Sequence, residues 1–333
     1  PNLLHWDWFA GEEALEMDER EFIPFDGAFI PRFEEEVLEE DERTVTYRDS
    51  AGRVRRALKE GAIRGARSSM DTYLQFPVAS MEDWQALKRR LDARCAQRYE
   101  PNWRRLRVDG WRARRWPLIF APNCATRGFY WFARDLMGTE ALSYALYDQP
   151  ALVHDIMEFH ADFLIEAARP VLACTTIEYM CLNEDLAMKT GPLLSPRAYR
   201  EFIFPRLRRV VEFAKSHGTR YFCIDTDGNP EPIIPLFLDA GVDIIWPLER
   251  AADQDPLRLR RTYGRSLRLW GGVDKRVLAR GPRQIEAHLR AMIPLIEEGG
   301  FIPTVDHLVP PDVSWSNFQF YLECKRRLLA LAL

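Results

Sequence analysis

The alternation of short apolar runs with amphipathic segments is the feature that most restricts how this chain can fold. Six runs rich in β-branched and aromatic residues predict strands: PLIFAP (117–122), TTIEYMCL (175–182), RYFCID (220–225), VDIIWPL (242–248), LRLWGG (267–272) and FIPTVD (301–306). Segments at helical spacing alternate with them, over 149–172, 195–217, 230–240, 254–263, 281–298 and 312–331. Repeated βα units of this length predict a parallel sheet covered by helices.

An open doubly wound sheet and a closed barrel both fit this alternation. The phosphate-binding turns GxGxxG and GxxxxGK[ST], which mark many open nucleotide-binding sheets, are absent from the sequence. We therefore predict a (β/α)8 TIM barrel over residues 80–333, preceded by an irregular N-terminal extension, residues 1–79, that packs on it. Two further barrel strands have to come from residues 1–79 or from residues upstream of Pro1.

Composition limits the classes of partner. The net charge is −4, which gives no general attraction for nucleic acid or anionic lipid. No apolar run approaches the roughly 18 residues that a membrane-spanning helix needs. The 6 cysteines are scattered without a CxxC pair, as is usual where thiols stay reduced. We therefore expect a cytoplasmic protein that binds neither nucleic acid nor a membrane.

Polar and acidic residues follow the predicted strands, where a parallel barrel gathers its working groups at one mouth. In chain order they are Asn123, Cys124, Asn183, Glu184, Asp185, Asp225, Asp227, Glu249, Asp274, Asp306 and His307. Crowded carboxylates raise one another's pKa and can act as general acids, and carboxylates with an imidazole can also hold Zn²⁺ or a harder divalent ion. Spacing alone leaves both chemistries open.

Several of these residues also have purely structural explanations. Asp274 in GGVDKRV is placed to cap the next helix, and Asp227 in DTDGNP is placed to brace a turn. The aromatic run Phe129, Tyr130, Trp131 and Phe132 fits either a wall for a flat substrate or ordinary core packing. The acidic segment EEEVLEEDER (34–43) is expected to be a solvated surface.

Four segments make the sequence similar to the uroporphyrinogen decarboxylase superfamily, which includes the cobalamin-dependent methyltransferases. They are LNEDLAMKTGPLLSPRAYREFIFPRL (182–207), DTDGNPEPIIPLFLDAGVDIIWPLE (225–249), LRLWGGVDKRVLARG (267–281) and GGFIPTVDHLVPPDVSWSNFQFYLE (299–323). Weaker matches are RGFYWFARDLMG (127–138) and MDTYLQFPV (70–78). The resemblance covers most of residues 70–330 and implies a (β/α)8 barrel.

The resemblance implies one of two activities. In the methyltransferase branch, Zn²⁺ is held by His-x-Cys after one strand and by Cys after the last, and here Asp225-Thr226-Asp227 and His307 stand at those positions. Similar DxDG sequences occur in demethylating members, which pass a methyl group to a corrinoid on a partner protein. True decarboxylases use an Arg-rich N-terminal segment, which this chain lacks, although Arg64 and Arg67 lie in a suitable region and His307 resembles the decarboxylase histidine.

We therefore expect a substrate-specific methyltransferase that moves a methyl group from an O- or N-methyl compound, such as a methoxyaromatic, to cobalamin carried by a corrinoid-binding partner protein. A porphyrinogen decarboxylase and a non-catalytic binding subunit are the alternatives. The predicted catalytic residues are Glu184, Asp225, Asp227, Glu249 and His307, with Asp227, Glu249 and His307 as ligands if Zn²⁺ or another divalent metal binds. The predicted substrate-binding residues are Asn123, Arg127, Tyr130 and Trp131.

Overall fold

The computed structural model describes residues 15, 17–59, 62–63, 66–67, 71–121 and 126–332, with only the backbone described for 62–63, 66–67 and 332. Its main sheet runs in the order β1-β8-β10-β13-β14-β15-β16, with β9 pairing β10 beside β8. Every pairing in it is parallel. The strands are β1 (Glu21–Phe22), β8 (Leu118–Phe120), β9 (Thr126–Arg127), β10 (Tyr179–Asn183), β13 (Tyr221–Asp225), β14 (Ile244–Trp246), β15 (Arg268–Val273) and β16 (Phe301–Val305).

The six strands predicted from the apolar runs are confirmed as β8, β10, β13, β14, β15 and β16. A seventh, β1, comes from the N-terminal region and pairs with β8 through Glu21 and Phe22. Among the described residues no pairing joins β1 to β16, so the structure shows a curled parallel sheet and not a closed barrel. The structure thus confirms the parallel α/β architecture of the predicted (β/α)8 barrel, but the described residues do not show a closed barrel.

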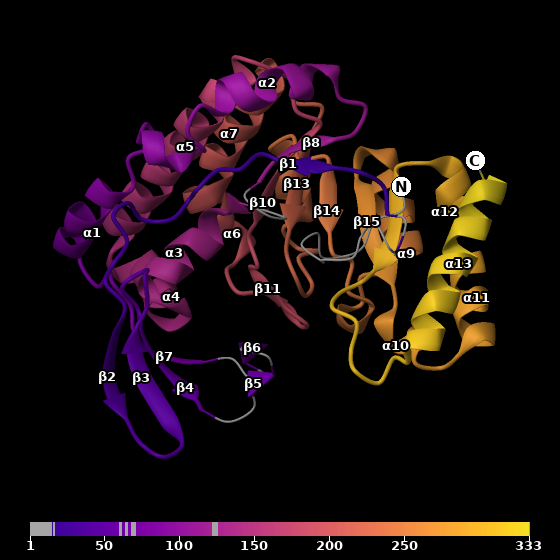
Figure 1. The fold of residues 1–333 in the computed structure, drawn as a ribbon, viewed down its shortest axis with the longest axis horizontal. Helices are drawn as coiled ribbons and strands as arrows, with labels where there is room; N and C mark the ends of the chain where they lie inside the picture. The colour runs from indigo at the N-terminus through magenta and orange to yellow at the C-terminus, as the bar shows by residue number, and fades with distance from the viewer. Residues whose placement is uncertain are drawn as a thin grey trace.

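Helices cover the outside of the curled sheet (Figure 1). Helices α3, α5 and α7 lie on one flank, while α11, α12 and α13 lie on the other. The helices are α1 (Met81–Leu87), α2 (Trp103–Ala113), α3 (Phe129–Met137), α4 (Thr139–Asp148), α5 (Pro150–Leu172), α6 (Pro196–Ala198), α7 (Phe204–Ser216), α8 (Ile234–Asp239), α9 (Pro256–Tyr263), α10 (Lys275–Leu278), α11 (Pro282–Arg290), α12 (Ile293–Glu298) and α13 (Trp315–Ala332). A π-helical turn, Tyr199–Ile203, joins α6 to α7. Within the described part of the chain, no helix is both long and apolar enough to cross a bilayer.

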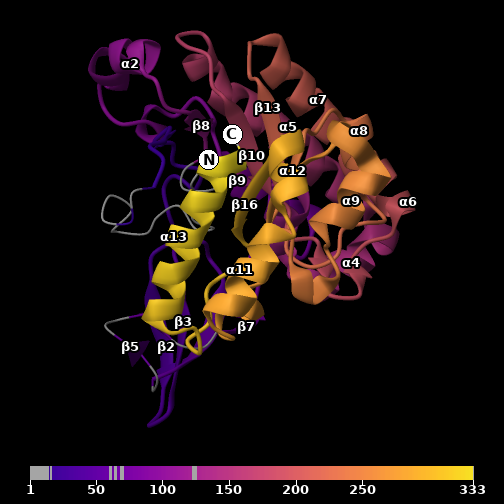
Figure 2. The same ribbon diagram turned by 90° about the vertical axis from the view of Figure 1, so that its right-hand side faces the viewer.

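A small antiparallel sheet stands beside the main one, and both views show it projecting from the body of the molecule (Figures 1 and 2). Its order is β2-β3-β4-β7, from β2 (Glu36–Glu40), β3 (Thr44–Arg48), β4 (Val54–Leu58) and β7 (Thr72–Gln75). Short pairs are formed by β5 (Ala62–Ile63) with β6 (Ala66–Arg67) and by β11 (Ala187–Met188) with β12 (Gly191–Pro192). The division of the chain at residue 79 stays a prediction.

The small sheet contacts the body of the molecule through α3. Arg53, directly before β4, binds Asp135 of α3 at 3.0 Å, and the amide of Val78 donates to the carbonyl of Leu136. Strand β2 is exposed along its whole length, as expected for the acidic segment, although it is a strand and not an irregular surface. Charged side chains on an edge strand discourage pairing with another chain.

Inside the curled sheet, side chains alternate toward the interior and toward the helices, as the period of two requires. The interior set is small and separate from the main core: Ile119, Ala121, Tyr179, Cys181, Cys223, Ile244, Trp246 and Trp270. Trp246 and Trp270 stack with ring centroids 4.8 Å apart. These side chains fill the middle of the curled sheet.

Candidate active site

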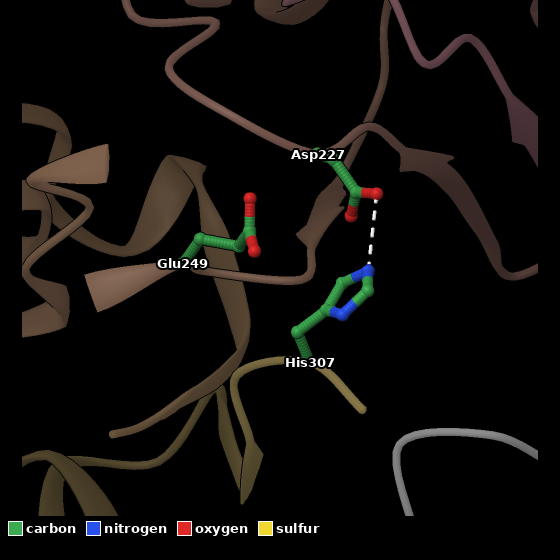
Figure 3. Close-up of side chains that lie close together, drawn as sticks. All are labelled: Asp227, Glu249 and His307. Atoms are coloured by element: carbon green, nitrogen blue, oxygen red, sulfur yellow. Dashed lines mark hydrogen bonds and ion pairs between the residues drawn. The ribbon is translucent and has the colours of Figure 1, made fainter. Parts of the chain in front are cut away.

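Three loops at the carboxyl edge of the main sheet bring Asp227, Glu249 and His307 together. Strand β13 ends at Asp225, β14 at Trp246 and β16 at Val305, and each of the three side chains follows its strand by two or three residues. One ligand atom from each residue lies within 4.8 Å of the others. Figure 3 shows the carboxylate of Glu249 facing the Asp227–His307 pair. We call these three residues the acid–histidine cluster.

A hydrogen bond joins the two most exposed members of the cluster. His307 Nε2 lies 3.1 Å from Asp227 Oδ2, and this contact raises the pKa of the imidazole against the opposing effect of burial. The side chain of Asp227 is 40% exposed and that of His307 is 22% exposed. The pair can therefore hold a proton near neutral pH at a point that solvent and a substrate can reach.

Glu249 is oriented by two donors. Its Oε2 accepts a 2.9 Å hydrogen bond from the amide of Gly228, and its Oε1 lies 3.3 Å from Lys275 Nζ. Gly228 has a φ of +76°, and a Cβ there would meet the backbone of Ala187 and Met188 at 2.6–2.7 Å. The turn after Asp227 thus requires glycine, and it fixes the amide that positions Glu249.

Asp306, next to His307, holds two neighbouring loops in place. Its side chain is fully buried, its Oδ2 accepts from the amide of Arg250 at 2.8 Å, and its Oδ1 accepts from the amide of Lys275 at 2.9 Å. Burial raises the pKa of this carboxyl. Asp306 therefore ties the loops that carry Glu249 and Lys275 to the loop that carries His307, and it acts as a positioning residue.

Lys275 lies beside the acid–histidine cluster although it is not among the strand-end candidates, and Asp306 is among those candidates without an assigned role. Lys275 follows Asp274, which is confirmed as the cap of α10 because its side chain accepts from the amide of Arg276. The available signal for Lys275 was its place directly after a strand, beside that cap. Asp306 was recognised only as a strand-end acid, because the backbone amides that it binds come from loops distant in sequence.

Glu184 and Asp225, both predicted to be catalytic, lie outside the acid–histidine cluster. Glu184 is fully buried, and its Oε2 accepts a 2.7 Å hydrogen bond from the amide of Tyr130 in the first turn of α3. Burial raises the pKa of Glu184 to about 7. Asp225 is buried at the last position of β13, between Asn183 and Trp246 in register. The structure thus gives Glu184 a structural place at a helix start.

The predicted substrate-binding residues are spread over different environments. Tyr130 is buried in the main core, whereas Trp131 is half-buried with the guanidinium of Arg134 5.5 Å from its ring centroid. Arg127 binds Asp135, with Nε 2.7 Å from Oδ2. Asn123 lies outside the described residues, as does Arg64, and the side chain of Arg67 is not described. Core packing accounts for most of the aromatic run.

The donor set of the cluster fits a divalent metal ion. Two carboxylates and one imidazole, from three different loops, suit Zn²⁺ or a harder ion, and no thiolate stands among them. Two groups compete with such an ion: the proton on His307 and the ammonium of Lys275 beside Glu249. Binding of a metal would therefore release a proton and require Lys275 to move away.

The fold and the site define the chain as an α/β protein whose curled parallel sheet carries an acid–histidine site at its carboxyl edge. The profile of the family described as Uroporphyrinogen decarboxylase (URO-D) matches residues 132–328. The matched region contains all three residues of the acid–histidine cluster, Lys275 and Asp306. The chain belongs to the uroporphyrinogen decarboxylase family.

Individual proteins also resemble the chain, and two of them are informative. A uroporphyrinogen decarboxylase from Hydrogenovibrio crunogenus is 26% identical over 180 residues, which are 50% of this chain and 46% of that protein. The alignment thus spans under half the length of this curated relative. A solved structure of a methyltransferase from Methanosarcina mazei matches with a TM-score of 0.61 at 15% identity, covering 96% of this chain and 82% of the other. At that identity the likeness concerns the fold.

Proposed function

We propose that this protein is the substrate-specific methyltransferase of a corrinoid-dependent demethylation system, taking a methyl group from an O- or N-methyl compound. The observation that carries the proposal is the hydrogen-bonded His307–Asp227 pair, 3.1 Å apart and partly open to solvent, with Glu249 beside it. Membership of the uroporphyrinogen decarboxylase family and the fold shared with a methyltransferase support it.

Transfer of the methyl group from an ether to a nucleophile leaves negative charge on the substrate oxygen, and that atom must take up a proton. The imidazole of His307, kept protonated by Asp227, supplies the proton to the leaving atom in this proposal. Lys275 adds positive charge next to Glu249 and stabilises the developing anion. Asp306 holds these groups in position, because it binds the amides of Arg250 and Lys275 in the two neighbouring loops.

If a divalent metal were bound by Asp227, Glu249 and His307, the imidazole would have lost its proton, and the metal would polarise the leaving oxygen in its place. A corrinoid carried by the partner protein supplies the nucleophile for the methyl group. Exposed apolar side chains next to the cluster suit docking of such a partner: Met188 is 59% exposed, Leu308 54% and Val309 41%. Leu308 and Val309 follow His307 directly, and the carbonyl of Met188 accepts from the amide of Asn229.

The experiment that tests this proposal incubates the protein with Co(I) cobalamin and a panel of methoxylated and N-methylated compounds and follows methylcobalamin by its absorption. We expect Asp227→Asn to lower the rate about 100-fold or more, since general acid catalysis contributes roughly 10²–10⁴. The matched control is Asp239→Asn at the exposed end of α8, which should retain the wild-type rate. No methyl transfer across the whole panel contradicts the proposal.

A second candidate is a decarboxylase of porphyrinogens or of another carboxylated ring, and the decarboxylase relative is the observation that favours it. Several arginines should then face the site, whereas Arg127 is bound to Asp135. Formation of coproporphyrinogen from uroporphyrinogen, without methylcobalamin formation, would establish this activity. Substrate binding without either product would favour the non-catalytic binding subunit.

A further inference from the structure

A cavity of about 740 Å³ opens at the end of the main sheet opposite the acid–histidine cluster. The strands enter its wall at their first residues: Tyr179 begins β10, Tyr221 begins β13 and Ile244 begins β14. Because all these strands are parallel, the cavity marks the amino end of the sheet, and we call it the amino-end cavity. Its volume is within the range of sites that hold small organic molecules, about 300–1,000 Å³.

Aromatic rings form much of its wall. Trp270 is 1% exposed and stacks on Trp246 toward the middle of the sheet, while Tyr179 meets it edge-on with ring centroids 6.0 Å apart. Tyr221 stands nearer the opening, with the guanidinium groups of Arg220 and Arg268 5.2 and 4.8 Å from its ring centroid. Tyr221 is partly exposed, so a flat apolar ring can replace water against it.

The opening is rich in arginine. Arg115, Arg220 and Arg265 line it, are exposed, and make no ion pair with a carboxylate among the described residues. Three acids also line the cavity, Asp18, Glu19 and Glu178, and Glu178 is already bound by Arg114 at 2.8 Å and by the amide of Leu118. Guanidinium groups without carboxylate partners are available to bind a carboxylate or a phosphate with two parallel hydrogen bonds.

We propose that the amino-end cavity is a second binding site, for a small aromatic molecule that carries a carboxylate or a phosphate group. The ring lies against Tyr221 at the opening, and the anionic group faces Arg220 and Arg265. The site is separate from the acid–histidine cluster, and the proposal does not depend on which reaction that cluster performs.

Isothermal titration calorimetry with the full chain tests the proposal, using benzoate and phenyl phosphate as probes. Benzyl alcohol and inorganic phosphate test the ring and the charge separately. We expect at least one aromatic anion to bind about tenfold or more tightly than both single-feature probes, since a hydrogen bond to a charged group contributes roughly 1.5–3 kcal/mol. The stronger of the two anions identifies carboxylate or phosphate as the natural group.

Substitutions test whether the aromatic anion binds in the amino-end cavity. Arg220→Ala combined with Arg265→Ala should weaken the aromatic anion about tenfold or more, whereas Arg283→Ala, at an exposed arginine of α11, should leave it unchanged. Tyr221→Ala should weaken binding more than Tyr221→Phe, with thermal unfolding measured for each variant. Asp227→Asn, at the opposite end of the sheet, should leave the affinity for the aromatic anion unchanged. Absence of binding, equal binding of benzyl alcohol, or loss through Asp227→Asn would overturn the proposal.

Discussion

His307 shows how one contact sets the charge of a site residue. Its pKa is raised because the protonated imidazole binds Asp227. A histidine shifted in this direction contributes stability that is fully present below its unfolded pKa of about 6.5 and is lost as the pH rises through the folded pKa. The pair should therefore stay intact in mildly acidic solution and open in alkaline solution.

We predict that Asp227→Asn lowers the pKa of His307, because the neutral amide no longer favours the imidazolium. NMR titration of the His307 ring resonances measures this shift, and Asp239→Asn serves as the control. Under the proposed function, the methyl-transfer rate of the wild type should fall as the pH rises through the same folded pKa. Identical titrations of His307 in the wild type and in Asp227→Asn would show that another group sets its charge.

At the scale of elements, Glu184 couples β10 to the first turn of α3. Its buried carboxyl has a pKa of about 7 and accepts from the amide of Tyr130. A carboxyl whose folded pKa is raised contributes stability that is present below the unfolded pKa, here 4.5, and is lost as the pH rises through about 7.

We predict that Glu184→Gln removes the loss of folding stability that accompanies ionisation of Glu184. The free energy of unfolding of the wild type should fall relative to the variant between pH 5 and pH 7.5, by at most roughly 3 kcal/mol, because each pKa unit corresponds to about 1.4 kcal/mol. Urea denaturation at the two pH values measures it, with Glu212→Gln on the exposed face of α7 as control. Equal pH dependence in wild type and Glu184→Gln would contradict the prediction.

The elements that sequence reasoning found are those with a repeated local signal. Gly218, Gly241 and Gly264 all have positive φ after their helices, and Ser80 forms a capping box with Asp83. By contrast, β1 is 2 residues long, too short for a period to be recognised. Most of the small antiparallel sheet was also missed, since β2 carries more charged than apolar residues and β4 contains two consecutive arginines.

The sequence predicts those site residues whose position depends only on where a strand ends. Asp227, Glu249 and His307 each follow a predicted strand, and their convergence stems from the parallel order of β13, β14 and β16. Glu184 follows a strand equally closely but turns toward a helix start, which depends on packing around Gly128, where a Cβ would lie 2.5 Å from Glu184. The direction of such a side chain is set by tertiary packing and cannot be predicted from the spacing of residues in the sequence.

At the scale of the whole molecule, the two ends of the main sheet are separated by the stacked rings of Trp246 and Trp270. Trp246 pairs in register with Asp225 near the carboxyl edge, while Trp270 borders the amino-end cavity. Both side chains are 1% exposed, so the described interior contains a solid aromatic layer between the ends.

This aromatic layer separates the two ends of the sheet, so binding at one end should be thermodynamically independent of binding at the other. Molecules held at opposite ends of the sheet cannot touch or exchange through the interior, so their binding free energies should simply add, with a coupling free energy near zero. If Zn²⁺ binds the acid–histidine cluster, titrating benzoate or phenyl phosphate with and without saturating Zn²⁺ should give the same Kd within about twofold. A larger difference would reveal a two-state rearrangement that spans the aromatic layer.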